Sequence, residues 1–374
     1  MKTAIYTLTS ELHDEKAVES MTLDFLGSLG VEYIFRGSDY ADYGRYPLSL
    51  IYVRTGGTEG IFQRLLPMLM EKSHQPFYLL TSGKSNSLAA SMEILSYLRQ
   101  KGILGEILHG SKEYITQRIL ALVRVGEARL NLNNCRLGVI GKPSDWLISS
   151  NADYDIVRER LGIELVDIPM QELLDATDVC TIYEGLKKII STHRLNGFTL
   201  RCFDLLTALK NTGCLALAKL NNEGYVAGCE GDVPAMLSMM IARSLTGFSG
   251  FQANPARINL DTGELLFAHC TIPLDMVERY ELDTHFESGI GVGVRGYMKE
   301  GPVTLFKISG DLKRSFVAEG TLVRSTAEPD LCRTQQVIQL SDPSQISYFL
   351  TNPIGNHHIV IPGHIGSLLE EMLK

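Results

Sequence analysis

Residues that could bind a metal ion stand next to apolar runs of this 374-residue chain. Glu230 and His269 each come directly after such a run, and His357 and His358 come directly before one. Carboxylate and imidazole groups without thiolates suit Mn²⁺, Mg²⁺, Co²⁺ or Fe²⁺ better than a structural zinc ion. Because apolar runs of this length predict strands, we expect three strand ends to converge on one divalent cation.

Each of these residues also has a plainer structural interpretation. Successive side chains of a strand point to opposite faces, so at most one of His357 and His358 can join Glu230. A strand-end histidine such as His269 is more often a hydrogen-bonded core residue than a ligand. Asp232 precedes Val-Pro at the start of a helical pattern, and we interpret it only as the N-cap of that helix. Glu230 has no comparable structural role, which favours a functional one.

Two loop residues are candidates for contact with a substrate. Trp146 lies in the loop 141–146 and Asn86 in the polar loop 81–87, and both loops follow predicted strands. In open parallel sheets, ligands bind beyond the carboxyl ends of the strands. A single tryptophan more often serves in packing, but beside a cleft it could stack on a sugar ring. Neither the loop 81–87 nor the similar Gly-rich loop 54–59 carries a dinucleotide or P-loop fingerprint, so no nucleotide site is predicted.

The composition restricts the class of protein. A length of 374 residues predicts two or three domains. The formal net charge of −8 argues against nucleic acid as a partner, since phosphate binding needs a basic surface. The seven cysteines are scattered without a C-x-x-C pair, which indicates reduced thiols. With no signal-peptide pattern and no run of about 18 apolar residues, we expect a cytoplasmic protein without a membrane partner.

The spacing of apolar residues predicts an α/β protein of three domains. Residues 1–135 and 136–246 alternate buried strands with helices, which is typical of two Rossmann-like, doubly wound sheets. From 247 to 374, short strands separated by turns predict an antiparallel β-barrel. Predicted strands span 3–8, 31–35, 48–53, 76–80, 136–141, 163–168, 197–202, 256–260, 264–269, 290–297, 303–309, 316–323, 335–340 and 358–361. Predicted helices span 15–29, 60–72, 86–101, 111–132, 153–161, 170–194, 204–210, 214–222, 233–245 and 365–373.

Several motifs resemble those of the L-fucose isomerase and L-arabinose isomerase superfamily, and in particular its shorter, fucose-isomerase-like members. In order, they are TSGKSNSLAASMEIL (81–95), GKPSDWLIS (141–149), GCEGD (228–232), FQANP (251–255), LLFAHCTIP (265–273), HFESGIGVGVRGYMKEGPVTLFKISGD (285–311) and GNHH (355–358). The resemblance implies a cytoplasmic aldose–ketose isomerase acting on a free sugar, with two Rossmann-like domains and a C-terminal β-barrel. It also implies a homo-oligomer, either a trimer or a hexamer.

The resemblance further implies a divalent cation, usually Mn²⁺, which stabilises charge on two substrate oxygens while an acidic pair moves a proton between C1 and C2 through an ene-diol. Residue by residue, Glu230 matches the first acidic ligand and His358 or His357 the C-terminal histidine. His269 matches a further ligand of the arabinose branch. The second acidic position falls on Asn254.

Asn254 departs from the family pattern. Its amide oxygen can bind a metal ion, but it cannot accept a proton from carbon. Another carboxylate, such as Asp232 or Glu264, would have to complete the pair. Two functions therefore stay open: a metal-dependent sugar isomerase, or a catalytically impaired member that binds a sugar or acts as a regulatory subunit. A related epimerase or lyase would share the ene-diol chemistry.

Overall fold

The computed structural model describes residues 2–73, 75–177 and 181–374, and the chain divides into two compact units. The first unit contains residues 1–130 and 371–374, and the second contains residues 131–370. Cys180 lies outside the described residues, and the six described cysteines are free thiols. Among the described helices, none is both long and apolar enough to cross a membrane.

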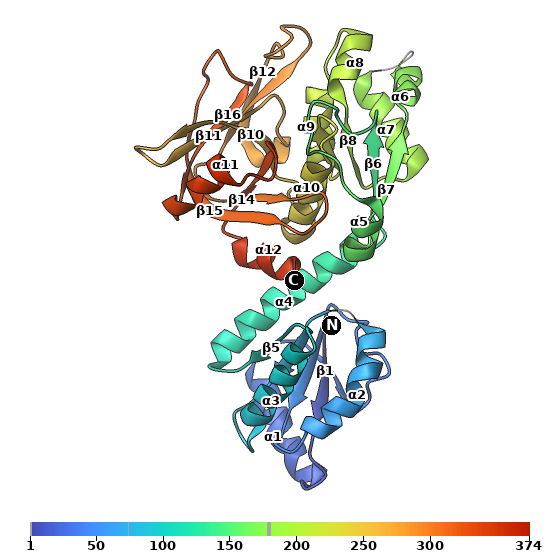
Figure 1. Cartoon of the computed structure of the whole chain (residues 1–374), viewed down its shortest axis with the longest axis vertical. Helices are drawn as coiled ribbons and strands as arrows, with labels where there is room; N and C mark the ends of the chain where they lie inside the picture. The colour runs from blue at the N-terminus through green and yellow to red at the C-terminus, as the bar shows by residue number, and fades with distance from the viewer. Residues whose placement is uncertain (1, 74, 178–180) are drawn as a thin grey trace. The chain divides into compact units, whose positions relative to one another are not determined.

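The first unit is built on a five-stranded parallel sheet in the order β2-β1-β3-β4-β5, flanked by helices (Figure 1). Its elements are β1 (Thr3–Leu8), α1 (Glu15–Ser28), β2 (Ile34–Gly37), β3 (Leu48–Val53), α2 (Glu59–Lys72), β4 (Phe77–Leu80), α3 (Ser87–Gln100), β5 (Gly105–Leu108) and α4 (Lys112–Leu132). In β1, Ala4 and Tyr6 belong to one apolar core and Ile5 to another. Both faces of the sheet are therefore covered, which explains the continuous apolar runs.

Two strands of this sheet differ from the sequence-based prediction. β2 begins three residues later than expected. Val31 and Tyr33, which made this run look like a strand, lie before the strand and pack against the apolar core. β5 was not predicted at all. It is a short strand at the edge of the sheet and only Leu108 in it is buried, so it leaves no apolar run in the sequence.

The second unit begins with a four-stranded parallel sheet in the order β7-β6-β8-β9. Its elements are β6 (Arg136–Ile140), α5 (Tyr154–Leu161), β7 (Glu164–Ile168), α6 (Met170–Thr177), α7 (Ile182–His193), β8 (Gly197–Leu200), α8 (Cys202–Leu209), α9 (Cys214–Asn222), β9 (Val226–Cys229) and α10 (Val233–Thr246). The helical stretch predicted for 170–194 is α6 and α7, and residues 178–180 between them lie outside the described part. α10 is buried along most of its length.

The rest of the second unit is a closed antiparallel barrel in the order β10-β11-β16-β15-β14-β17. The ring closes because β10 pairs with both β11 and β17. The elements are β10 (Phe251–Asn259), β11 (Glu264–His269), a 3₁₀ turn (Leu274–Met276), β12 (Val277–Asp283), β13 (Gly293–Met298), β14 (Gly301–Ile308), β15 (Ser315–Ser325), β16 (Thr334–Leu340), a second 3₁₀ turn (Pro343–Gln345), α11 (Ile346–Thr351), β17 (His358–Pro362) and α12 (Gly366–Met372).

Outside the barrel, β12 and β13 form a separate hairpin, and Val294 and Met298 of β13 enter the barrel core. β12 was not predicted, because its exposed and charged sequence, VERYELD, has no buried face. β10 is longer than predicted and contains Pro255, a residue type that is normally confined to edge strands, strand starts and bulges. The proline is tolerated because the pairing register shifts there, between Pro255 and Arg257.

The predicted fold class is confirmed: an α/β protein with two parallel sheets, followed by an antiparallel β-barrel. For function, the important feature lies within the second unit. The carboxyl end of β9, the last residue of β11 and the residue before β17 all carry candidate ligands, and β10 lies between β11 and β17 in the barrel.

Candidate metal centre

Glu230 lies in the tight turn between β9 and α10. Its backbone φ is +63°, and that of the following Gly231 is +73°, so both residues are left-handed. A glutamate in this conformation carries strain of about 1–3 kcal/mol, and such strain clusters at functional sites. The turn is held by Ser144, whose hydroxyl donates to the carbonyl oxygen of Glu230 and whose backbone N–H donates to that of Gly231 at 3.4 Å.

His269 is the last residue of β11, where it pairs with Thr334 of β16. Its side chain is 4% exposed, and neither ring nitrogen has a hydrogen-bond partner among the described residues. Buried imidazoles are normally satisfied by a donor or an acceptor. A buried ring whose nitrogens make no hydrogen bond, and whose Nε2 has only the Glu230 carboxylate nearby at 3.5 Å, is therefore what a ligand-binding histidine would present.

His357 and His358 point to opposite faces, as the alternation of a strand requires. His357 is fully buried, and its Nδ1 lies 2.9 Å from Oδ2 of Asp232. Because a carboxylate only accepts, Nδ1 of His357 carries a proton and donates it to Asp232. Nε2 has no partner among the described residues. Metal-binding histidines usually donate one ring N–H to a carboxylate in this way, which orients the ring and leaves the other nitrogen for the ion.

His358 lies in an aromatic cluster formed by Phe267, Phe316, Tyr348 and Phe349. Both of its nitrogens have partners, since Nε2 lies 2.9 Å from the Tyr348 hydroxyl and Nδ1 2.9 Å from the carbonyl oxygen of Asn356. Burial lowers the pKa of His358 to about 3, so the ring is neutral. Of the two C-terminal histidines, the structure therefore brings His357, and not His358, to Glu230.

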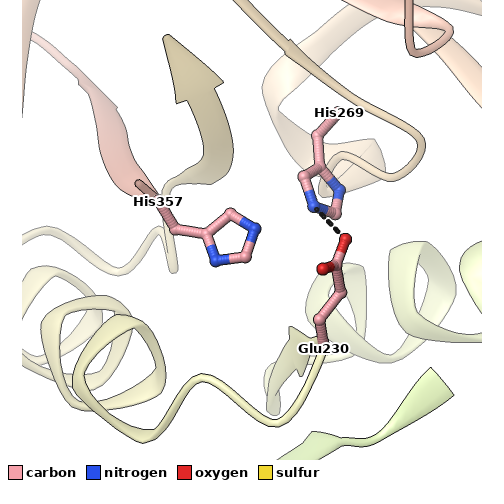
Figure 2. A group of neighbouring side chains, drawn as sticks. All are labelled: Glu230, His269 and His357. Carbon is pink, nitrogen blue, oxygen red and sulfur yellow. Dashed lines mark ion pairs between the residues drawn. The ribbon is translucent and has the colours of Figure 1, made fainter. Parts of the chain in front are cut away.

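The side chains of Glu230, His269 and His357 point toward one shared space (Figure 2). One potential ligand atom of each lies within 4.8 Å of the others. Oε1 of Glu230 lies 3.5 Å from Nε2 of His269, and the two imidazole centroids are 5.2 Å apart. Donors bound to one ion at about 2.1 Å lie no more than about 4.2 Å apart, so small side-chain movements would place all three on one ion.

The carboxyl group of Glu230 is ionised at neutral pH. Burial by itself would raise its pKa, but the close contact with the His269 ring, the positive charge of His357 and His269 when protonated, and the Trp146 side chain together lower the pKa to about 2. An anionic oxygen beside two imidazoles is a donor set that suits a divalent cation such as Mn²⁺, Fe²⁺, Co²⁺ or Zn²⁺.

Asp232 does more than the helix cap that the sequence indicated. Its Oδ1 accepts from the backbone N–H of Ala235 at 2.8 Å, so it is the N-cap of α10. It also accepts from His357, and Nζ of Lys307 lies 3.1 and 3.2 Å from its two oxygens. Burial alone would raise the pKa of Asp232, but Lys307 and His357 hold it well below its usual range. Asp232 is therefore a buried anion that orients His357.

Lys307 was not singled out from the sequence. It is 2% exposed and lies in β14, inside the apolar run VTLFKI (303–308). A lysine in the middle of such a run was the signal that could have found it, because a buried ammonium group needs an anionic partner.

Trp146 lies in the loop whose Ser144 holds the turn of Glu230. The indole is 42% exposed and packs edge-on against Phe203 at 5.4 Å, and the guanidinium of Arg201 lies 5.0 Å from the ring centroid. Phe203 in turn contacts the ring of His285 at 6.3 Å. The role of this partly exposed side chain in stacking on a sugar stays a prediction.

Two further residues predicted for the site, Asn254 and Asn86, are not among the three candidate ligands. Asn254 is half-buried in β10, and its Oδ1 accepts from Nδ2 of Asn356, the residue before His357, at 3.0 Å. Asn86 is exposed at the N-terminus of α3, with φ +57° and no capping hydrogen bond from its side chain. It belongs to the first unit, whereas the three candidate ligands belong to the second.

The chain is similar to known sugar isomerases over about half its length. It is 22% identical over 231 residues to "Sulfoquinovose isomerase" of Priestia aryabhattai and of Priestia megaterium, an alignment that covers 52% of this chain and 52% of each relative. The corresponding protein of a Clostridium species is 22% identical over 228 residues, covering 52% of this chain and 49% of that protein. No known family profile matches the chain. The chain thus spans about half the length of the curated relatives that it matches.

Proposed function

We propose that this protein is an aldose–ketose sugar isomerase related to the L-fucose and L-arabinose isomerases. The observation that carries the proposal is the convergence of Glu230, His269 and His357 from three distant segments. Three buried imidazole nitrogens without partners among the described residues, next to an ionised carboxylate, fit a divalent cation. The similarity to sulfoquinovose isomerases supports the same class of reaction.

In this proposal Glu230, His269 and His357 hold the cation, for which we propose Mn²⁺. When bound, such an ion stabilises the negative charge that develops on two adjacent sugar oxygens. The protein contributes the rest through its own groups. Asp232 fixes the tautomer and orientation of His357, the strained turn fixes Glu230, and the partly exposed face of Trp146 receives the sugar ring.

We propose a free aldose as the substrate, either a pentose, a deoxyhexose or a sulfonated sugar such as sulfoquinovose. The last of these follows from the relatives, which are named for that sugar. We further propose that the protein works as a homo-oligomer, a trimer or a hexamer, which sedimentation velocity would measure directly.

The proposed function is tested with purified protein, Mn²⁺ and a panel of aldoses that includes L-fucose, L-arabinose and sulfoquinovose. Formation of the ketose is followed by NMR, and metal content is measured by elemental analysis. We expect stoichiometric metal, turnover of one class of aldose, loss of turnover in EDTA and its recovery with Mn²⁺. Protein that stays free of metal in excess Mn²⁺ and converts no aldose would contradict the proposal.

Asn254 is the observation that favours the second function, a sugar-binding member with impaired catalysis. Replacing Asn254 by aspartate is expected to raise Mn²⁺ affinity about tenfold, because the added negative charge would offset that of the cation. The fold should tolerate the change, since a carboxylate can also accept the hydrogen bond from Asn356. Isothermal titration with Mn²⁺ measures the effect.

The matched control for this variant is Asn259→Asp, which adds the same charge at the far end of β10, where the side chain accepts from turn N–H groups. Equal affinities for both variants would argue against a role for position 254. If Asn254→Asp also gains isomerase activity that the wild type lacks, the impaired-member function is the better account.

A further inference from the structure

Two of the three candidate ligands lie on segments that pair with the same barrel strand, β10. This strand pairs with β17 at His358 and with β11 at Ala268. These two residues directly adjoin His357 and His269 in the chain. Strand pairing with β10 therefore sets how far apart the two histidine ligands lie.

The third candidate ligand, Glu230, is linked to β10 by a side chain. Gln252, the second residue of β10, is 3% exposed. Its Oε1 accepts from the backbone N–H of Cys229 at 2.9 Å, and its Nε2 donates to the carbonyl oxygen of Cys229 at 2.8 Å. Cys229 is the last residue of β9 and directly precedes Glu230. One carboxamide thus binds both backbone groups of the residue before the ligand.

This contact continues the hydrogen bonding of the parallel sheet. Among the described strands, β9 pairs only with β8, so it is an edge strand. An edge strand leaves backbone donors and acceptors on its outer side. A carboxamide carries both a donor and an acceptor, as the backbone of a neighbouring strand does. Gln252 therefore joins the edge of the sheet to the wall of the barrel.

Gln252 also holds one side of a strained turn. Glu230 has a left-handed φ of +63°, and such a conformation persists only where the surrounding structure fixes the chain. Ser144 binds the turn at Glu230 and Gly231, whereas Gln252 binds it at the preceding residue. Without Gln252, the chain before Glu230 would lose its hydrogen bonds to the barrel, and the turn would be free to relax.

Gln252 and Asn254 lie on the same face of β10, because side chains alternate along a strand. The residue between them belongs to the barrel core. Asn254 accepts from Asn356, whose own Oδ1 accepts from the backbone N–H of His357 at 2.9 Å. The outer face of β10 thus contacts two ligand-bearing segments, one through each of these side chains.

Resting on the metal centre proposed above, we propose that Gln252 is a positioning residue of this site. Its carboxamide fixes the end of β9 against β10, and so holds the carboxylate of Glu230 where it can share an ion with His269 and His357. In this role Gln252 touches neither the ion nor the sugar. Loss of such an outer contact usually lowers the affinity of a metal site about 10- to 100-fold.

The test replaces Gln252 by methionine, which has a similar length and can make neither hydrogen bond. We expect the Mn²⁺ affinity of Gln252→Met, measured by isothermal titration, to fall about 10- to 100-fold. The electron paramagnetic resonance spectrum of the bound Mn²⁺ should also change, because it reports the arrangement of the ligands. A loss of stability alone would not alter that spectrum. If methionine prevents folding, Gln252→Asn is the second variant: it keeps the carboxamide, is too short to reach both groups of Cys229, and should lower the affinity in the same way.

Gln336→Met is the matched control. Gln336 is fully buried in β16, and its side-chain amide donates to the carbonyl oxygen of Gly296 at 2.9 Å and accepts from the hydroxyl of Ser325 at 2.8 Å. The same substitution there removes one donated and one accepted hydrogen bond, and neither partner adjoins a candidate ligand in the chain. The melting temperature should fall in both variants, but Gln336→Met should keep the Mn²⁺ affinity and the spectrum of the wild type.

Each result decides between the proposals. If folded Gln252→Met binds Mn²⁺ as the wild type does, Gln252 has no positioning role and the metal centre stands. Equal loss of affinity in the Gln252 and Gln336 variants would also overturn that role, because general destabilisation would then explain both losses. A wild type that binds no Mn²⁺ defeats the metal centre itself, and the role of Gln252 falls with it.

Discussion

Replacing His357 by alanine is expected to lower Mn²⁺ affinity at least about 100-fold, while replacing its neighbour His358 by phenylalanine leaves the affinity within threefold. The two variants should differ because His357 and His358 point to opposite faces of the chain at the start of β17. His357 presents an unpartnered Nε2 beside Glu230 and His269, whereas both nitrogens of His358 are bound within an aromatic cluster. Changes in the second shell of a metal site already cost 10- to 100-fold in affinity, so loss of a ligand should cost no less.

The measurement is isothermal titration with Mn²⁺, accompanied by circular dichroism to show that both variants are folded. Phenylalanine suits position 358 because Phe267, Phe316 and Phe349 surround it with aromatic contacts. Glu230→Ala and His269→Ala should behave like His357→Ala if the three residues share one ion. Equal loss of affinity in the His357 and His358 variants, both folded, would show that the cation does not bind where Figure 2 places the three side chains.

Replacing Lys307 by methionine is expected to lower the free energy of unfolding by about 3–5 kcal/mol, which is the usual cost of leaving one member of a buried ion pair alone. Lys307 and Asp232 are each 2% exposed, and the ammonium group contacts both carboxylate oxygens. Without Lys307 the carboxylate keeps only His357 and the Ala235 N–H. Urea-induced unfolding, followed by fluorescence of Trp146 in the same unit, measures the change.

Two controls define the origin of this effect. Lys313→Met, at an exposed lysine whose side chain is 74% accessible, should change stability by less than about 0.5 kcal/mol. The double variant Asp232→Asn/Lys307→Met should recover more than half of the loss, because an asparagine oxygen can still cap α10 and no buried charge remains. If the single and double variants are equally unstable, then cavity or packing effects, and not the unpaired charge, explain the loss.

The same pair predicts how stability depends on pH. The pKa of Asp232 is held below its usual value, which is about 3.9. Its contribution to stability is therefore fully present above pH 4 and is lost as the pH falls through the lower pKa of the folded state. The difference in stability between wild type and Lys307→Met should be large at pH 7 and should shrink below about pH 4.

Much of the fold could be predicted from local pattern. The runs that became β1, β3 and β4 are buried throughout and mostly apolar because both faces of their sheet are covered, and this property is visible in the sequence. Strands without that property escaped prediction. β5 is half-exposed at an edge, and β12 is charged on its exposed faces. Such strands form because they hydrogen-bond to a neighbouring strand, and that strand lies outside the local sequence.

For the candidate site, the sequence by itself determined which residue types stand at the strand ends, and that His357 and His358 must face opposite ways. Only the tertiary structure decided which of the two faces Glu230, because that depends on how β17 pairs with β10 and β14 in the closed barrel. It also decided that Asp232 is more than a helix cap, since Lys307 lies 75 residues away. Long-range contacts of this kind leave no local periodicity in the sequence.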